Sequence, residues 1–383
     1  MNDKTETPSI SIGPRVRKSP YFESTIRYGA KAFTVYNHMY MPTSYSDPVS
    51  EYRSLVEGVT LWDVACERQV EISGPDAAQF TQLLTPRNIS ACAVNQCMYV
   101  MLTDSNGGIV NDAVLLRVAK HQFWLSPGDG DVLLWAQGIA AQSELDVEVT
   151  EPDVSPMQLQ GPLAPRVAER LFGRLAYDLG YYRMQATELD SIPLVLSRTG
   201  WSGEVGYELF LQDSRYGDEL WERVAEAGRD FDIAPIAPSA IRSIEGGILS
   251  YVSDIQRSDD PFTLGMGRLV DLDMEADFIG KEALRKIKDS GPRRRLVGVE
   301  IGGEPIAGND QFWSVLRNGE DVGYITRCAF SPRLKKNIGF ANLPTGLSEP
   351  GERFEVDTRS ESVDAVVVKT PWFQSLKKIE RPS

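Results

Sequence analysis

Glu208 lies in a glycine-rich segment between two apolar, strand-like stretches. The segment runs from Ser197 to Leu209, and its apolar flanks are Leu194–Leu196 and Leu209–Leu211. Glycines at 200, 203 and 206 give the backbone the freedom that a tight reversal needs, so the segment predicts a β-hairpin. A carboxylate beside apolar strand is costly to bury without hydrogen-bond donors, and a flat heterocycle with adjacent N–H groups would supply them. The alternative is a surface hairpin with a solvated glutamate.

Asp112 is a second candidate for chemistry. It follows Gly107-Gly108 and precedes the apolar run Ala113–Leu116. Near a transfer site, a carboxylate can orient a cationic donor and stabilise positive charge in the transition state, or relay a proton if burial raises its pKa. The sequence leaves both roles open, and an aspartate that only stabilises the turn is the alternative. The aromatic rings of Tyr99 and Tyr182 could contact a cation. Taken singly, each tyrosine is more typical of a residue in the hydrophobic core or at the edge of a site.

The elements that must position these residues indicate several domains. A chain of 383 residues exceeds the usual size of one core, so two or three domains are expected. Between about 58 and 150, alternating strands and helices predict a ferredoxin-like β-α-β-β-α-β module, with a helix over Ala77–Leu84. A further helix is expected over Ala237–Tyr251, and a charged helix and linker over Gly280–Arg295. From Leu296 onward, strand-like sequence with frequent Gly and Pro suits a small β-barrel.

Composition narrows the class of protein. A net charge of −14 disfavours nucleic-acid binding, because phosphates require concentrated Lys and Arg. Four cysteines without a Cys-x-x-Cys pair, and only two histidines far apart in sequence, indicate neither a disulfide framework nor a zinc site, so no metal is expected. No apolar run approaches the length of a membrane span, and the first residues lack a signal core. A cytoplasmic protein without a membrane partner is the expectation.

The segment Ser197–Leu209 resembles the pterin-binding hairpin of the glycine-cleavage T-protein (aminomethyltransferase) family, with the frame S-R-T-G-[YW]-[ST]-G-E-x-G-[FY]-E. This resemblance, which extends over about residues 13–372, implies an α+β, three-domain T-protein-like fold around a central folate channel. It places a folate-binding domain at 14–57 and 151–270, a ferredoxin-like domain at 58–150, and a C-terminal β-barrel domain at 285–377.

The resemblance also implies the cofactor and its contacts. Tetrahydrofolate is the expected co-substrate. Glu208 would anchor the pterin ring, and Tyr182 and Tyr99 would pack around it. By the frame G-G-[IV]-x-[DN]-D, Asp112 would lie near the reacting N5 of the folate as the catalytic residue. Glu245 would support the site from its helix.

Other motifs resemble the tetrahydrofolate-dependent dimethylsulfoniopropionate demethylases more than the glycine-cleavage enzymes. These motifs include Tyr36-Asn37-His38-Met39, Trp62–Ile72 and Gly247–Tyr251. The resemblance implies transfer of a methyl group from a small methylated donor to N5 of tetrahydrofolate. The candidate donor-binding residues are Tyr36, Trp124, Ser126 and Trp201. Alternatives are an aminomethyltransferase with a lipoyl carrier protein as partner, a demethylase of another O- or N-methyl donor, and a non-enzymatic folate-binding protein.

Several positions depart from these relatives. The hairpin itself follows the aminomethyltransferase pattern, and Phe210 replaces a tyrosine of the demethylases. Ser243 stands where both relatives carry arginine, Thr263 replaces a glutamate, and Arg327-Cys328 replaces a Ser-Gly pair. A lost arginine or tyrosine would change donor recognition by more than about tenfold, since unpaired polar groups are costly. These departures weaken the inference about the donor and leave the inference about folate intact.

Overall fold

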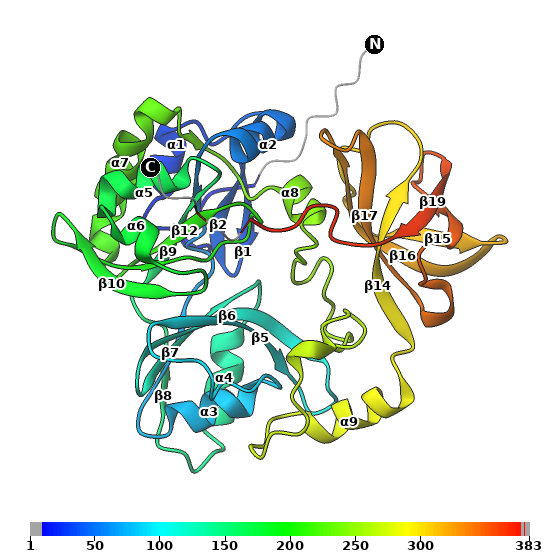
Figure 1. Ribbon diagram of the computed structural model, residues 1–383, viewed down its shortest axis with the longest axis horizontal. Coiled ribbons are helices and arrows are strands. Elements are labelled where there is room, and N and C mark those ends of the chain that lie inside the picture. The colour runs from blue at the N-terminus through cyan, green and yellow to red at the C-terminus, as the bar shows by residue number, and fades with distance from the viewer. Residues whose placement is uncertain (1–9, 377–378, 380–383) are drawn as a thin grey trace.

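The computed structural model describes residues 10–376 and residue 379. Its strands form a two-stranded sheet, a six-stranded sheet, a five-stranded sheet and a closed six-stranded barrel. Figure 1 shows the two larger sheets and the barrel arranged around a common centre, each with its own core. The α+β class with a C-terminal barrel, predicted from the sequence, is confirmed.

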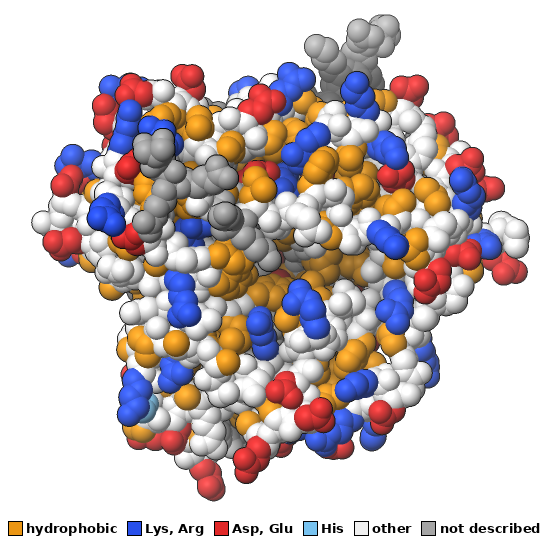
Figure 2. All heavy atoms as spheres, in the orientation of Figure 1, with side chains coloured by type: hydrophobic (Ala, Val, Ile, Leu, Met, Phe, Trp, Pro, Cys, Tyr) orange, Lys and Arg blue, Asp and Glu red, His pale blue; other side chains and the backbone are white. Residues whose placement is uncertain are grey.

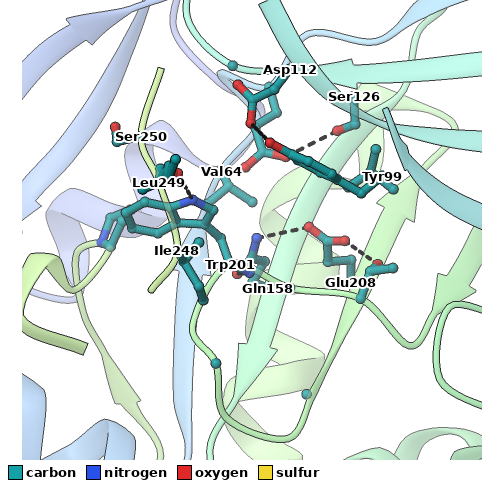
Figure 3. Close-up of a pocket in the computed structure, with 18 of the residues that line it drawn as sticks. Val64, Tyr99, Asp112, Ser126, Gln158, Trp201, Glu208, Ile248, Leu249 and Ser250 are labelled. Carbon is teal, nitrogen blue, oxygen red and sulfur yellow. Dashed lines mark hydrogen bonds between the residues drawn. The ribbon is translucent and has the colours of Figure 1, made fainter. Parts of the chain in front are cut away.

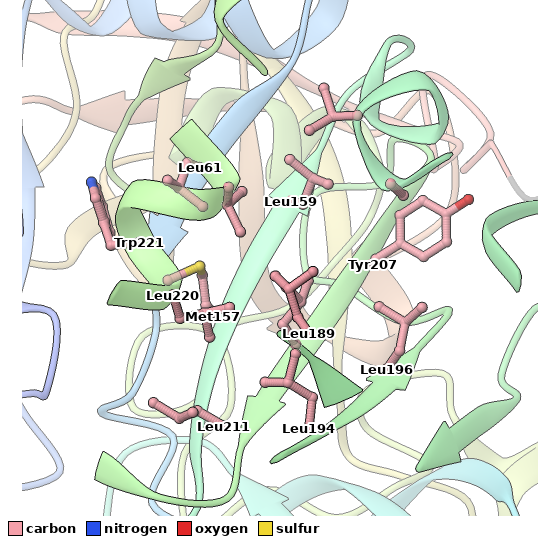
Figure 4. Close-up of a cluster of buried hydrophobic side chains, with 14 of the residues drawn as sticks. Leu61, Met157, Leu159, Leu189, Leu194, Leu196, Tyr207, Leu211, Leu220 and Trp221 are labelled. Atoms are coloured by element: carbon pink, nitrogen blue, oxygen red, sulfur yellow. The ribbon is translucent and has the colours of Figure 1, made fainter. Parts of the chain in front are cut away.

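The six-stranded sheet has the order β10-β11-β12-β9-β3-β13. Its strands are β3 (Thr60–Asp63), β9 (Ser155–Gln160), β10 (Met184–Leu189), β11 (Ile192–Ser197), β12 (Gly206–Leu211) and β13 (Ala234–Pro235). Because side chains alternate between the two faces of a strand, Tyr207, Leu209 and Leu211 of β12 join one core, as Figure 4 shows in part. Glu208 and Phe210 therefore lie on the opposite face.

Helices cover the core face of this sheet. They are α5 (Ala164–Phe172), α6 (Leu175–Asp178) and α7 (Gly217–Gly228), with α1 (Phe22–Arg27) packed against α7. The two-stranded sheet of β1 (Ala32–Tyr36) and β2 (Met39–Ser44) leads into α2 (Pro48–Glu57). Asp47 caps α2 because its side chain accepts from the amides of Val49 and Ser50.

The five-stranded sheet is antiparallel throughout, with the order β5-β6-β7-β4-β8. Its strands are β4 (Val70–Ser73), β5 (Gln96–Thr103), β6 (Ile109–Ala119), β7 (Gln122–Pro127) and β8 (Glu148–Thr150). Helices α3 (Ala77–Leu84) and α4 (Val132–Ala140) share a core with it (Figure 1). The sheet has one strand more than a β-α-β-β-α-β order contains.

The domain boundaries stay a prediction, with one strand placed differently from the expected range. β3 falls within 58–150, yet it pairs with β9 in the six-stranded sheet. The strand at 60–63 therefore packs with the first sheet rather than with the ferredoxin-like module. The last residue of the expected third domain, 377, lies outside the described residues.

The helix expected over Ala237–Tyr251 is much shorter. α8 spans Ala240–Glu245, and the chain then turns through Gly246 and Gly247. Gly247 has φ +66°, a conformation that few other residues adopt without strain, so the helix ends there. The freed residues 248–251 form a loop, and this loop lines the central cavity.

The charged helix α9 (Lys281–Ser290) leads into the barrel. The barrel closes in the order β14-β17-β16-β15-β18-β19. Its strands are β14 (Arg294–Ile301), β15 (Trp313–Arg317), β16 (Glu320–Ser331), β17 (Lys336–Pro344), β18 (Arg353–Asp357) and β19 (Ser362–Val368). After β19 the chain returns across the molecule to α8, as the red trace in Figure 1 shows. There the amide of Phe373 donates to the carbonyl of Glu245, and the amide of Leu376 to that of Gly203.

On the face in Figure 2, hydrophobic side chains gather near the middle, where the parts of the chain meet, while charged side chains of both signs cover the surroundings. Within residues 10–376 and 379, no helix has the length and apolar character needed to cross a bilayer. Over the same residues, no group of three or more His, Cys, Asp and Glu side chains is placed to hold a metal ion.

Candidate active site

A cavity of about 390 Å³ lies where the two larger sheets meet, a size within the usual range of small-molecule sites. Side chains of the Glu208 hairpin form one wall, and Asp112, Ser126 and Tyr99 of the five-stranded sheet form another. The loop 248–251 and the C-terminal residues Ser375 and Leu376 complete the lining. Figure 3 shows Glu208 and Gln158 on one side of the Tyr99 ring and Asp112 on the other.

The hairpin buries Glu208. β11 and β12 pair antiparallel with Ser197 opposite Glu208, as the sequence predicted, and Glu208 is only 3% exposed. Its Oε1 accepts from Gln158 Nε2 at 2.8 Å, and its Oε2 accepts from the hydroxyl of Thr199. Burial raises the pKa of this carboxyl, although the two hydrogen bonds act in the opposite direction. The alternative of a solvated surface glutamate is therefore wrong.

The glycines of the hairpin make room for a buried side chain. Gln160 lies against the turn and donates from Nε2 to the carbonyls of Thr199 and Tyr207. A Cβ added at Gly200 or Gly206 would come within 2.3 or 2.4 Å of the Gln160 amide. A side chain at either position would therefore displace the Gln160 amide from its hydrogen bonds to Thr199 and Tyr207.

Asp112 lies on β6 and faces the same cavity. Its Oδ2 accepts from the hydroxyl of Tyr99 at 2.9 Å. Burial raises the pKa of Asp112 to about 6, while the hydrogen bond from Tyr99 lowers it. The turn before β6 is instead held by Asp104, whose Oδ1 accepts from the amides of Asn106 and Gly108. The interpretation of Asp112 as a turn-stabilising residue is therefore not supported.

The structure brings most of the other predicted residues to this cavity. Tyr36, Tyr99, Ser126, Tyr182 and Trp201 all line it. Tyr182 has φ +58° and is held by backbone hydrogen bonds on both sides, from its amide to Arg198 and from the Cys97 amide to its carbonyl. The indole of Trp201 donates to the carbonyl of Leu249 at 3.2 Å, which ties the hairpin to the loop 248–251.

Two predicted residues lie away from the cavity lining. Trp124 packs against Phe210, with ring centroids 6.3 Å apart, and its Nε1 donates to Glu71 at 2.7 Å. Phe210 also lies outside the lining. Glu245 is fully buried and accepts from Tyr52, Ser331 and Arg333, which joins α8 to α2 and the barrel. It supports the fold around the site rather than lining it.

Several contributors to the cavity were not predicted from the sequence, among them Glu67, Gln158, Arg198 and the loop 248–251. Glu67 lies within the motif Trp62–Ile72, but no role was predicted for its side chain. Gln158 is at the centre of β9 and pairs with Glu208 of β12. Its place beside Glu208 follows from the order of the strands in the sheet, which the sequence alone does not show. The loop was not predicted because a continuous helix was expected over these residues.

Comparison with known families agrees with this geometry. The GCVT N-terminal domain model matches residues 21–274, and the glycine cleavage T-protein C-terminal barrel domain model matches residues 294–374. The chain therefore belongs to the glycine-cleavage T-protein family. Tetrahydrofolate is the co-substrate of this family, so the prediction of the cofactor is confirmed.

Individual relatives carry two different names. A dimethylsulfoniopropionate demethylase from Ruegeria pomeroyi is 37% identical over 350 residues, with 91% of this chain and 95% of the relative covered. An aminomethyltransferase from Symbiobacterium thermophilum is 31% identical over 373 residues, with 94% and 98% covered. The crystal structure of the glycine cleavage system aminomethyltransferase T from Bartonella henselae superposes with a TM-score of 0.84 at 21% identity, over 94% of this chain and 99% of that one, which confirms the fold.

The cavity fits a reduced folate. Glu208 presents a buried carboxylate, with each oxygen bonded to the protein once, and a second lone pair on each remains for N–H groups of a ligand. Tyr99 and Tyr182 add flat apolar faces nearby. A pteridine ring has both the N–H donors and the flat shape that such a wall requires.

Proposed function

We propose that this protein transfers a methyl group from a small methylated donor to N5 of tetrahydrofolate. The observation that carries the proposal is that one cavity contains both the buried Glu208 and the Tyr99–Asp112 pair. Tetrahydrofolate supplies the nucleophilic nitrogen. The chain's own residues must hold the two reactants in line and exclude water from them.

Each side chain has a part in this arrangement. Glu208 anchors the pterin through its N–H groups, and Tyr99 and Tyr182 pack around the ring. Asp112 stabilises positive charge beside the transfer point, with the Tyr99 hydroxyl fixing its orientation. Positioning contributes much of the rate, because a pre-oriented pair of reactants avoids the entropy cost of a bimolecular encounter.

A dimethylsulfoniopropionate-like donor is the favoured substrate. It is supported by the motifs around Tyr36, Trp62–Ile72 and Gly247–Tyr251, and by the 37% identity to the Ruegeria demethylase. The second candidate is aminomethyl transfer from a lipoyl carrier protein. It is supported by the hairpin Thr199–Gly206, which follows the aminomethyltransferase pattern, and by relatives of that name.

An assay of folate products separates these candidates. The purified protein is incubated with tetrahydrofolate and a panel of sulfonium, betaine-like and methoxy-aromatic donors, without a carrier protein. Methyl transfer gives 5-methyltetrahydrofolate. An aminomethyltransferase gives the methylene form and ammonia, and only with an aminomethylated lipoyl protein. Folate binding without turnover in either assay would make the protein a non-enzymatic binder and contradict the proposal. The expected cytoplasmic location stays a prediction.

A further inference from the structure

Glu67 is a third carboxylate in the central cavity, and neither the pterin anchor nor the transfer point uses it. It follows β3 in the loop before β4, and it lines the cavity with Tyr36 and Ser126. Burial raises the pKa of Glu67 well above its usual range, and the nearby carboxylates of Glu208 and Asp112 raise it further. The ionised form of Glu67 is therefore disfavoured unless a positive charge lies beside it.

Hydrogen bonds fix one oxygen of Glu67 and leave the other to the cavity. Gln69 Nε2 donates to the Ser126 hydroxyl at 2.8 Å, so that hydroxyl must turn its own proton to Glu67 Oε2, 3.1 Å away. Figure 3 shows this bond leaving Ser126. Among the described residues, Oε1 of Glu67 accepts no hydrogen bond. The side chain is thus held in place as an acceptor, with an open oxygen at the cavity wall.

Arg198 is a basic side chain that also lines the cavity, and its Nη1 donates to the carbonyl of Leu179. Of the ion pairs formed between described residues, none includes Glu67, Asp112 or Glu208. Aromatic rings surround the same space, among them Tyr36, whose phenol pKa is raised by burial and, to a smaller extent, by nearby groups that include Glu67. A carboxylate without an ion-pair partner beside aromatic faces favours a cation, and a methylated onium group suits this space because the carboxylate attracts its charge while the aromatic faces contact its methyl groups.

We propose that Glu67 binds the cationic head of the methyl donor and restricts the site to onium compounds, such as sulfonium or quaternary ammonium acids. A neutral methoxy compound would bring no positive charge to the three acids of the cavity. The inference deepens the proposed function and rests on it for the identity of the transferred group. Glu67 would determine specificity, while Asp112 and Glu208 keep the roles given above.

Binding of charged ligands and their neutral isosteres tests the proposal. Dimethylsulfoniopropionate and 4-methylpentanoate have the same branched shape and carboxylate, and differ in the positive sulfur. Each is titrated into the full chain by calorimetry, alone and with saturating folic acid as an unreactive folate. We expect the wild type to prefer the sulfonium by roughly tenfold or more, and Glu67→Gln to reduce this preference to about threefold or less by weakening only the cation.

Matched variants keep the result interpretable. Glu71→Gln makes the same substitution four residues along, at a carboxylate that contacts Trp124 and Gln122 outside the cavity, and should leave the preference unchanged. Glu67→Asp retains the charge and should keep part of the preference even if Glu67→Gln fails to fold. Equal wild-type affinity for the two ligands, no binding of either, or an undiminished preference in Glu67→Gln would overturn the proposal. Failure of the proposed function would instead appear as tetrahydrofolate that neither binds nor gains a methyl group.

Discussion

The guanidinium of Arg327 donates from Nη1 to the hydroxyl of Ser243 at 3.1 Å. Ser243 occupies the α8 position where the resembling sequences carry arginine, and Arg327 occupies a barrel position where they carry Ser-Gly. The guanidinium that is absent at position 243 of α8 is thus supplied by Arg327 from β16. The expectation that the loss of an arginine at position 243 changes donor recognition stays a prediction.

Arg327 also holds the cavity loop. Its Nε donates to Asp254 at 2.7 Å, its Nη2 donates to the carbonyl of Ile248 at 2.9 Å, and its guanidinium lies 5.7 Å from the Trp201 ring centroid. Asp254 is fully buried and accepts in addition from the amide of Ser250. Arg327 and Asp254 therefore anchor the loop 248–251 beneath the cavity.

Arg327→Ser should destabilise the protein by about 3 kcal/mol, because it leaves Asp254 buried without its counter-charge. Ser243→Arg should also destabilise it, since two guanidinium groups would compete for one site. The double variant Ser243→Arg/Arg327→Ser should recover at least about 1 kcal/mol relative to the sum of the single effects. Denaturant unfolding of the four proteins measures this coupling, and strictly additive effects would contradict a direct exchange.

Tyr99→Phe should shift the pH dependence of turnover. The Tyr99 hydroxyl lowers the pKa of Asp112, which burial sets at about 6, so its removal raises that pKa further. If the Asp112 carboxylate is the active form, kcat/KM of the wild type rises with pH through about 6 and then levels off. The rise in Tyr99→Phe should lie at higher pH. An unchanged or lower midpoint would show that another group controls the profile.

Asp112→Asn should make the protein more stable and less active. The folded-state pKa of about 6 lies above the ordinary value of 3.8, so the native state holds the proton more tightly than the unfolded chain. The charged carboxylate therefore reduces stability progressively between about pH 4 and pH 6, by about 3 kcal/mol in full above pH 6, and this cost disappears in the amide. At pH 4 the two proteins should unfold with similar free energies. Methyl transfer at pH 7.5 should fall by about 100-fold or more.

A gain in stability at pH 7.5 without loss of turnover would remove Asp112 from the catalytic assignment. Glu71→Gln is again a suitable comparison, since it removes one carboxylate of the same sheet outside the cavity. Its turnover should stay near that of the wild type.

Helices and strands were predicted well where neighbouring residues in the sequence determine them. The helix at Ala77–Leu84 has the expected bounds, and the strand pair around the Asp104 turn follows from its turn residues. The hairpin of Glu208 was found from its glycines and apolar flanks, although two of these glycines make space for Gln160 rather than only bending the chain.

The rest depends on contacts between distant segments. Glu67 and Glu208 are 141 positions apart in sequence, and only the packing of two sheets brings them to one cavity. The short α8 was a missed signal, because Gly246-Gly247 marks a helix end in the sequence itself. The alternation of side chains along a strand placed Trp124 on the same face as Ser126, but it did not predict which of the two reaches the cavity. Contacts with Phe210 and Glu71 hold Trp124 below the cavity wall.

Titration of tetrahydrofolate into the wild type and into Glu208→Gln, with the product assayed afterwards, tests the central assignment most directly. The wild type should bind with saturation and yield 5-methyltetrahydrofolate when an onium donor is added. Glu208→Gln should bind at least about tenfold more weakly, because the amide replaces one acceptor oxygen and the charge that receive the pterin N–H groups. No saturable binding to well-folded wild-type protein, or equal affinity in the variant, would contradict the account.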